Sequence, residues 1–281
     1  MAQEPTTGPV ETRIKVVDSI QLDGAIKYTA DRIRVKSGET DKISWDSTKG
    51  LGDAIDALPT DRQGILEDLS GFSFSNSSNL TEFIASIPNV TSLTNAFQLD
   101  NKLTKIELTV TNKLTSLSRM FGNRRNPYLE EIIFNGDLSK VTSYYEAFAC
   151  GETGMNDTLK KIHGLDFTST TNVSEIFVSQ RGLEDVTIKP DTLNVSMSIN
   201  TNRSLSVDSC VNILNALKDR TGQDALTLTA HENLKTESTG RLYANYVKLD
   251  STTNLYVSCE SADEGAITIA AAITAKNWTI A

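Results

Sequence analysis

The chain lacks several features that would point to a membrane protein or to a cofactor-dependent enzyme. Its 281 residues contain no run of about eighteen apolar residues, the length needed to cross a bilayer. The sequence has neither a glycine-rich phosphate-binding loop nor a serine in a nucleophile elbow. We therefore expect no membrane partner and no cofactor.

Histidine and cysteine are scarce. His163 and His231 are the two histidines, and neither has a glutamate or cysteine at the spacing of a metal ligand. The three cysteines, Cys150, Cys210 and Cys259, are far apart and odd in number, which argues against a disulfide framework and against a metal site. We expect buried free thiols.

Clustered positive charge is also missing. The formal net charge is −9, and the 27 lysines and arginines are scattered among 36 aspartates and glutamates. A nucleic-acid-binding surface needs clustered Lys and Arg to contact phosphates. We therefore expect no nucleic-acid partner.

The obvious pairs of carboxylates, which a glycosidase would need, are sequence neighbours. Glu130 and Glu131 fall in an expected strand, where adjacent side chains point to opposite faces. Asp263 and Glu264 open an expected helix, where the helix dipole alone favours acidic residues. We predict that the chain is not an enzyme.

What the chain does contain is a repeated phrase with a constant apolar skeleton. The first half of the phrase reads VTSLTNAF, LTSLSRMF, VTSYYEAF and, in a degenerate copy, NVSEIFVSQ, anchored at Val90, Leu114, Val141 and Val173. The second half reads LTKIEL, LEEIIF, LKKIHGL and LEDVTI, anchored at Leu103, Leu129, Leu159 and Leu183. Steps of about 24 to 32 residues are typical of a repeat array.

Each half predicts its own local structure. In VTSLTNAF the apolar positions lie on one side of a short helical turn. The second half alternates as a strand does, so that Ile106 and Leu108, or Val186 and Ile188, point to one face. A single such unit cannot bury its apolar side alone, so neighbouring copies must stack. We therefore predict a short solenoid over residues 61–204.

LTSLSRMF followed by LEEIIF resembles the leucine-rich repeats of BspA-like surface proteins, over residues 66–188. The resemblance implies an α/β fold, an irregular leucine-rich-repeat solenoid. Two departures from the family pattern are the variable loop lengths and the last copy, in which Val178 to Gln180 stand where the aromatic residue is expected.

The segments on either side of the array read differently. Residues 1–60 contain a stretch, from Thr12 to about Trp45, that alternates as strands do and has a hairpin signal at Asp23-Gly24; a short helix closed by Pro59 follows it. We interpret them as an attachment module; a small β domain packed on the solenoid remains the alternative.

Residues 205–281 begin with a helix that we expect to start at Ser206 as N-cap, to end near Gly222, and to close the solenoid with Cys210, Leu214 and Leu217. An Ala-rich helix and a strand around Trp278 follow. In its order of elements, this α/β cap resembles the segment that follows leucine-rich repeats in proteins of gut-bacterial phages.

The residues beside the central strand positions, all of them polar except Ile133, form the candidate ligand-binding face. They are Lys105, Glu107, Glu131, Ile133, Lys161, His163, Asp185 and Thr187. Their mixed charge suits a protein or glycan ligand, and an ordinary solvated face with no ligand remains open.

The first residues show no basic stretch followed by an apolar one, so we expect synthesis in the cytoplasm without a secretion signal. Together with the resemblance, this implies a structural protein of a tailed-phage virion, a fibre or decoration protein that forms homo-oligomers, most often trimers in such fibres, and is attached to other virion proteins through residues 1–60. The alternative is a bacterial cell-surface adhesin or interaction module.

Overall fold

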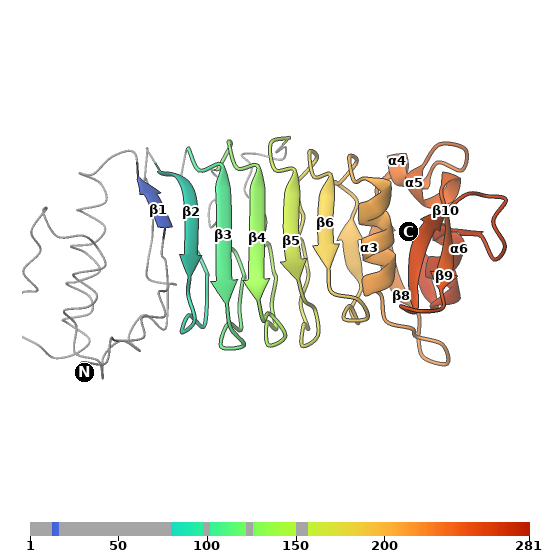
Figure 1. The fold of residues 1–281 in the computed structure, drawn as a ribbon, viewed down its shortest axis with the longest axis horizontal. Coiled ribbons are helices and arrows are strands. Elements are labelled where there is room, and N and C mark those ends of the chain that lie inside the picture. Colours follow the sequence, from blue (N-terminus) through green and yellow to red (C-terminus); the bar gives the residue numbers. More distant parts are fainter. Residues whose placement is uncertain (1–12, 17–79, 98–101, 122–125, 150–156) are drawn as a thin grey trace, which may run out of the picture.

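The protein forms a β-solenoid with few helices. The computed structural model describes residues 13–16, 80–97, 102–121, 126–149 and 157–281. The solenoid sheet consists of β1 (Arg13–Val16), β2 (Leu80–Ser86), β3 (Lys105–Val110), β4 (Glu131–Gly136), β5 (Lys161–Leu165) and β6 (Asp185–Ile188). These strands are hydrogen-bonded in chain order (Figure 1). Strands β2 to β6 are parallel, whereas β1 pairs antiparallel with β2. The predicted solenoid is confirmed.

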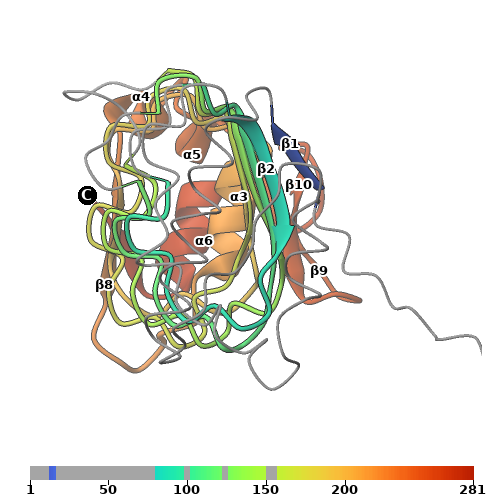
Figure 2. The same ribbon diagram turned by 90° about the vertical axis from the view of Figure 1, so that its left-hand side faces the viewer.

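The remaining elements lie at the C-terminal end of the solenoid. They are β7 (Met197–Ile199), α3 (Val207–Ala216), β8 (Leu226–Ala230), α4 (Glu232–Lys235), α5 (Arg241–Ala244), β9 (Tyr246–Asp250), β10 (Leu255–Cys259), β11 (Ile267–Thr268), α6 (Ile269–Ala275) and β12 (Trp278–Ile280). Seen along the solenoid axis, α3 and α6 lie within the outline of the coil, so they cover its C-terminal end (Figure 2). The predicted strand around Trp278 is present as β12, which pairs in parallel with β8.

The core is a column of apolar side chains shared by successive turns. Ile106 and Leu108 are fully buried, as the alternation predicts, because every second residue of a strand faces inward. The Phe148 and Phe177 rings stack with their centroids 5.9 Å apart. Each such side chain contributes about 1.5–3 kcal/mol by leaving water, which a single turn could not achieve alone.

The VTSLTNAF segments form a hydrogen-bonded turn rather than the short helical turn that we predicted. The third position of this turn has a positive φ in every described copy, at Asn95, Arg119, Glu146 and Glu175. A positive φ ends a right-handed helix. Backbone N–H groups that would have bonded within a helix bond to the next turn instead, as Leu93 does to the Ser116 carbonyl. The second side of each coil is therefore held by bonds between turns.

A threonine ladder reinforces this second side. Thr115, Thr142 and Thr171 each donate a backbone N–H and a side-chain hydroxyl to the carbonyl of the threonine one turn earlier. The steps along the ladder are 24, 27 and 29 residues. Turns of unequal length therefore stay in register at this position.

The degenerate copy is placed three residues away from our prediction. Asn172 bridges Ser143, which makes Thr170, not Val173, the counterpart of Val141. Thr170 is buried, and its hydroxyl reaches the Val141 carbonyl at 3.0 Å. The aromatic position is consequently filled by Phe177, and the prediction that Val178 to Gln180 replace it is wrong.

The strands become shorter towards β6, and glycines occur near the ends of two of them. Register shifts between β5 and β6, and β4 pairs with β5 only as far as Ile133 and His163. Gly164 lies at the register shift with a φ of +83°, and Gly136, the last residue of β4, has a φ of +102°. Such backbone favours glycine, and each glycine lies against a carbonyl of the preceding turn.

Helix α3 closes the end of the solenoid by packing on β6, as predicted, with Cys210, Leu214 and Leu217 buried. It starts as expected, because the Ser206 hydroxyl accepts a hydrogen bond from the Ser209 N–H. The predicted end near Gly222 is wrong, since the helix ends at Ala216.

The early end of α3 has a long-range cause. Leu217 leaves the helix to bridge Leu193, and the Lys276 ammonium donates to the Leu214 and Leu217 carbonyls. Burial lowers the Lys276 pKa. The Lys276 side chain, 59 residues from Leu217, therefore takes the place of the local helix end predicted near Gly222.

The Ala-rich helix starts later than predicted. Thr268 is its N-cap, and its hydroxyl accepts from the Ala271 N–H. Asp263 lies outside the helix and pairs with Lys248 at 2.8 Å. Neither Asp263 nor Glu264 therefore lies in the first turn of the helix.

The predicted hairpin at Asp23-Gly24 and the helix before Pro59 lie outside the described residues, as does Cys150. Cys210 is a buried free thiol, and burial raises its pKa to about 12. Cys259 is also free but only partly buried.

Candidate functional site

The structure brings the predicted ligand-face residues together on the outer side of the solenoid sheet. One row across the sheet consists of Lys105, Glu131, Lys161 and Asp185, and the next consists of Glu107, Ile133 and His163. Thr187 lies two residues beyond Asp185 on β6. All eight alternate with buried residues along their strands and are at least partly exposed.

The first row alternates in charge. Glu82 of β2 is in register with Lys105, so acidic and basic side chains follow one another across five strands. Lys105 contacts Glu131 at 3.4 Å, and Lys161 contacts Glu131 at 3.7 Å. Exposed pairs of this kind contribute at most about 1 kcal/mol each. Their main effect is to make the face mixed in charge and locally balanced.

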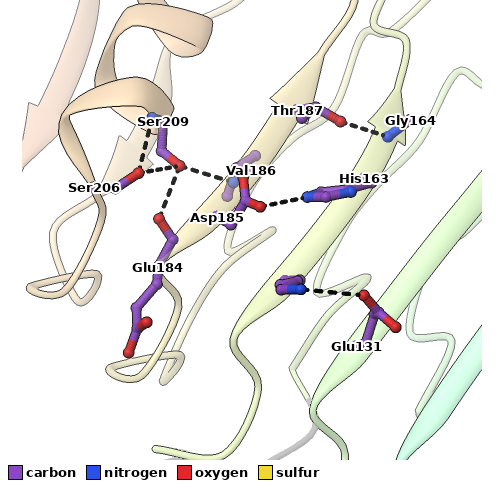
Figure 3. A network of polar contacts seen from close by, with 10 residues as sticks. Glu131, His163, Gly164, Glu184, Asp185, Val186, Thr187, Ser206 and Ser209 are labelled. Atoms are coloured by element: carbon purple, nitrogen blue, oxygen red, sulfur yellow. Dashed lines mark hydrogen bonds and ion pairs between the residues drawn. The ribbon is translucent and has the colours of Figure 1, made fainter.

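The second row carries the more distinctive groups. His163 Nε2 lies 2.8 Å from Asp185 Oδ2 (Figure 3). Hydrogen bonding to Glu107 raises the Lys105 pKa. Ile133 is a partly exposed apolar side chain between these polar groups. An apolar contact framed by polar groups is typical of a surface that binds a protein or a sugar.

Sequence reasoning missed a polar depression at the C-terminal ends of β4 to β6. It has a volume of about 510 Å³, and the residues that line it include Asp137, Gly164, Asp166, Thr187 and Lys189. Thr187 Oγ1 accepts a hydrogen bond from the Gly164 N–H at 3.0 Å. The available signal was an aspartate after each of two successive strands.

Asp166 is the buried member of this depression. Lys189 Nζ lies 2.8 Å from Asp166 Oδ2, and Thr168 donates to the other carboxylate oxygen. Burial raises the Asp166 pKa, but the hydrogen bonds from Lys189 and Thr168 outweigh this effect and leave the pKa below its usual range. The carboxylate is therefore held ionised as a structural anchor of the strand end.

The sheet ends at β6 in a hydrogen-bond network with α3 (Figure 3). The Ser209 hydroxyl donates to the Glu184 carbonyl at 2.8 Å and accepts from the Val186 N–H at 2.9 Å. Ser206 adds a backbone bond to the same carbonyl. A further solenoid turn would have hydrogen-bonded to these backbone groups at the edge of β6. Serines at the start of α3 bond to them instead.

The same helix covers a second strand edge. The Asn215 side chain donates to the Tyr256 carbonyl at 2.9 Å and accepts from the Tyr256 N–H at 2.8 Å. An amide side chain here takes the place of a neighbouring strand on β10. Sequence reasoning identified Ser206 as an N-cap but not these two roles of α3.

Most of the residues considered for catalysis have structural contacts. Glu131 pairs with two lysines, Asp263 pairs with Lys248, and His163 lies against Asp185. His231 is the N-cap of α4, where its Nδ1 accepts from the Asn233 N–H. Glu130 directly precedes β4 and is exposed, and Glu131 is the first residue of that strand.

Among the described residues, no group of three or more His, Cys, Asp or Glu side chains could hold a metal ion. In that same part of the chain, no helix is both long and apolar enough to cross a membrane. No protein-family model, curated protein or solved structure matches the chain.

Proposed function

We propose that this protein is a non-enzymatic structural and binding protein that presents the outer face of its solenoid sheet to a protein or glycan on a host surface. The observation that carries the proposal is the pair of rows across β3 to β6, in which charged side chains of both signs surround Ile133. A flat face on stacked strands is rigid, so binding would cost little conformational entropy.

The biological setting that we propose is a phage virion, in which the chain serves as a fibre or decoration protein. The repeat phrases and their resemblance to BspA-like leucine-rich repeats support this setting, as does the order of elements in the C-terminal cap. The alternative is a bacterial cell-surface adhesin. In both settings the repeats would supply the adhesive surface.

The binding face is tested by Ile133→Thr, which keeps a β-branched residue but removes the apolar contact. We expect at least a tenfold weaker binding to immobilised bacterial surface polysaccharides or to fixed cells, about 1.4 kcal/mol. Lys235→Ala on α4 serves as the control and should bind as the unchanged protein does. Equal binding by the unchanged protein and both variants would mean that this face of the sheet is not the binding surface.

The virion setting predicts self-association through the N-terminal segment. Light scattering behind size-exclusion should give a mass about three times that of the 30.7 kDa chain at micromolar concentration. The full chain must be used, because a chain starting at Asp61 would lose β1 and expose the edge of β2. A monomer at every concentration would favour the adhesin.

A further inference from the structure

A second cavity lies where the solenoid meets its C-terminal cap, away from the sheet face. This seam pocket has a volume of about 620 Å³ and is lined by Glu184, Arg203, Ser204, Ser206, Asn233 and Arg241. It brings together the residue before β6, the start of α3, and the helices α4 and α5. Figure 1 shows α4 and α5 beyond β6, at the level where the parallel strands of the solenoid begin.

Two guanidinium groups give the seam pocket its donors. Arg241 Nη1 donates to the Arg203 carbonyl at 3.2 Å, which holds one arginine beside the backbone of the other. Arg203 Nη2 lies 3.7 Å from Asp157 Oδ1, beyond hydrogen-bond distance. Within the described residues, Arg241 has no acidic partner within ion-pair distance. A guanidinium offers five N–H donors in a planar fork that matches a carboxylate.

The other groups that line the seam pocket suit the uncharged hydroxyl groups of a ligand that carries such a carboxylate. Ser204 and Asn233 can donate to and accept from hydroxyl groups. The Glu184 carboxylate is an acceptor already paired with Lys160 at 2.8 Å. Two carboxylates near the site, those of Glu184 and Asp157, would repel a dianion such as phosphate more than a monoanion.

We propose that the seam pocket binds a carboxylated sugar, such as a uronic acid unit of a surface polysaccharide. The two arginines hold the carboxylate, while the serine, asparagine and glutamate side chains contact the sugar hydroxyls. The volume exceeds what a bare ion needs and admits a monosaccharide. This inference rests on the proposed function for the source of the sugar, and it adds a second, chemically defined contact to the same polymer.

The test is titration calorimetry of the full chain with D-glucuronate, D-glucose and inorganic phosphate as probes. We expect glucuronate to bind in the millimolar range, and binding to weaken as salt rises from low to high concentration. Glucose binding as tightly as glucuronate, phosphate binding more tightly, or no binding by glucuronate would each overturn the proposal.

Arg203→Gln and Arg241→Gln should each raise the glucuronate Kd at least tenfold. Arg181→Gln, on the solenoid outside the seam pocket, is the matched control and should leave the Kd unchanged. Arg203→Gln removes only a surface side chain, so it carries the test if Arg241→Gln fails to fold. An equal loss of affinity in Arg181→Gln would show a general charge effect and overturn the site.

The two proposals fail in different ways. If glucuronate does not bind but Ile133→Thr still weakens attachment to polysaccharide, the seam pocket is wrong and the sheet face stands. If glucuronate binds through the arginines while Ile133→Thr has no effect, the seam pocket stands and the proposed face is wrong.

Discussion

Replacing Gly164 by alanine is expected to lower the free energy of unfolding by about 3 kcal/mol or more. The residue has a φ of +83°, and an added Cβ would lie 2.0 Å from the Phe134 carbonyl oxygen. That oxygen belongs to the backbone of the preceding turn, so β4 and β5 would have to separate. Urea unfolding followed by circular dichroism measures the change.

Gly222→Ala provides the matched control. Gly222 has nearly the same φ, +79°, but nothing lies within 4 Å of the position that a Cβ would occupy. It should lose only the cost of the backbone conformation, about 1 kcal/mol. The difference between the variants isolates the close contact between turns. Equal losses would mean that the sheet can open at Gly164 without cost.

This contact explains why the glycines occur where they do. The strands become shorter along the solenoid, and a register shift must be taken up between β5 and β6. At the shift the backbone of one turn closely approaches the next, which a side chain would prevent. The Gly164 N–H also donates to Thr187 Oγ1, so the same residue helps to shape the polar depression.

The parts of the fold that could be predicted from the sequence are those set by local periodicity. Ile106 and Leu108 alternate with polar residues, and that pattern alone places them in the core. The polar face followed from the same alternation, so the predicted residues share one side of the sheet. The position of Ser206 at a helix start was equally local, because its hydroxyl caps its own chain.

What could not be predicted depends on contacts between turns. Thr170 is polar, so the apolar pattern does not mark it as a core residue, yet its hydroxyl donates to the carbonyl of Val141. The pattern therefore slipped by three residues in that copy. The end of α3 was missed for a similar reason, since Lys276 acts from the far end of the chain.

Buried amides are a second feature without a local signal. Asn126, Gln180 and Asn202 are fully buried, and each donates its side-chain amide to a phenylalanine carbonyl of the preceding turn. In the sequence these residues look like ordinary loop positions. Only the stacked coil shows that each one supplies a hydrogen bond between neighbouring turns.

Replacing Ser209 by alanine should lower the free energy of unfolding by about 2–3 kcal/mol. Ser209 is fully buried, and its hydroxyl is the partner of the Val186 N–H. Alanine would leave that N–H buried without a partner, whereas the Glu184 carbonyl would keep its bond from the Ser206 N–H. Urea unfolding gives the stability change, and hydrogen exchange at the Val186 amide should accelerate well beyond its neighbours.

Ser206→Ala separates the two roles of the serine pair. It removes the N-cap of α3, a loss of about 1 kcal/mol, but leaves the Ser209 hydroxyl on Val186. If α3 protects the sheet edge, Ser209→Ala should be the more damaging change and should also associate as its concentration rises, because an uncovered strand edge pairs with other chains. Equal stability losses without association would mean that helix capping, rather than closure of the β6 edge, is what these serines provide.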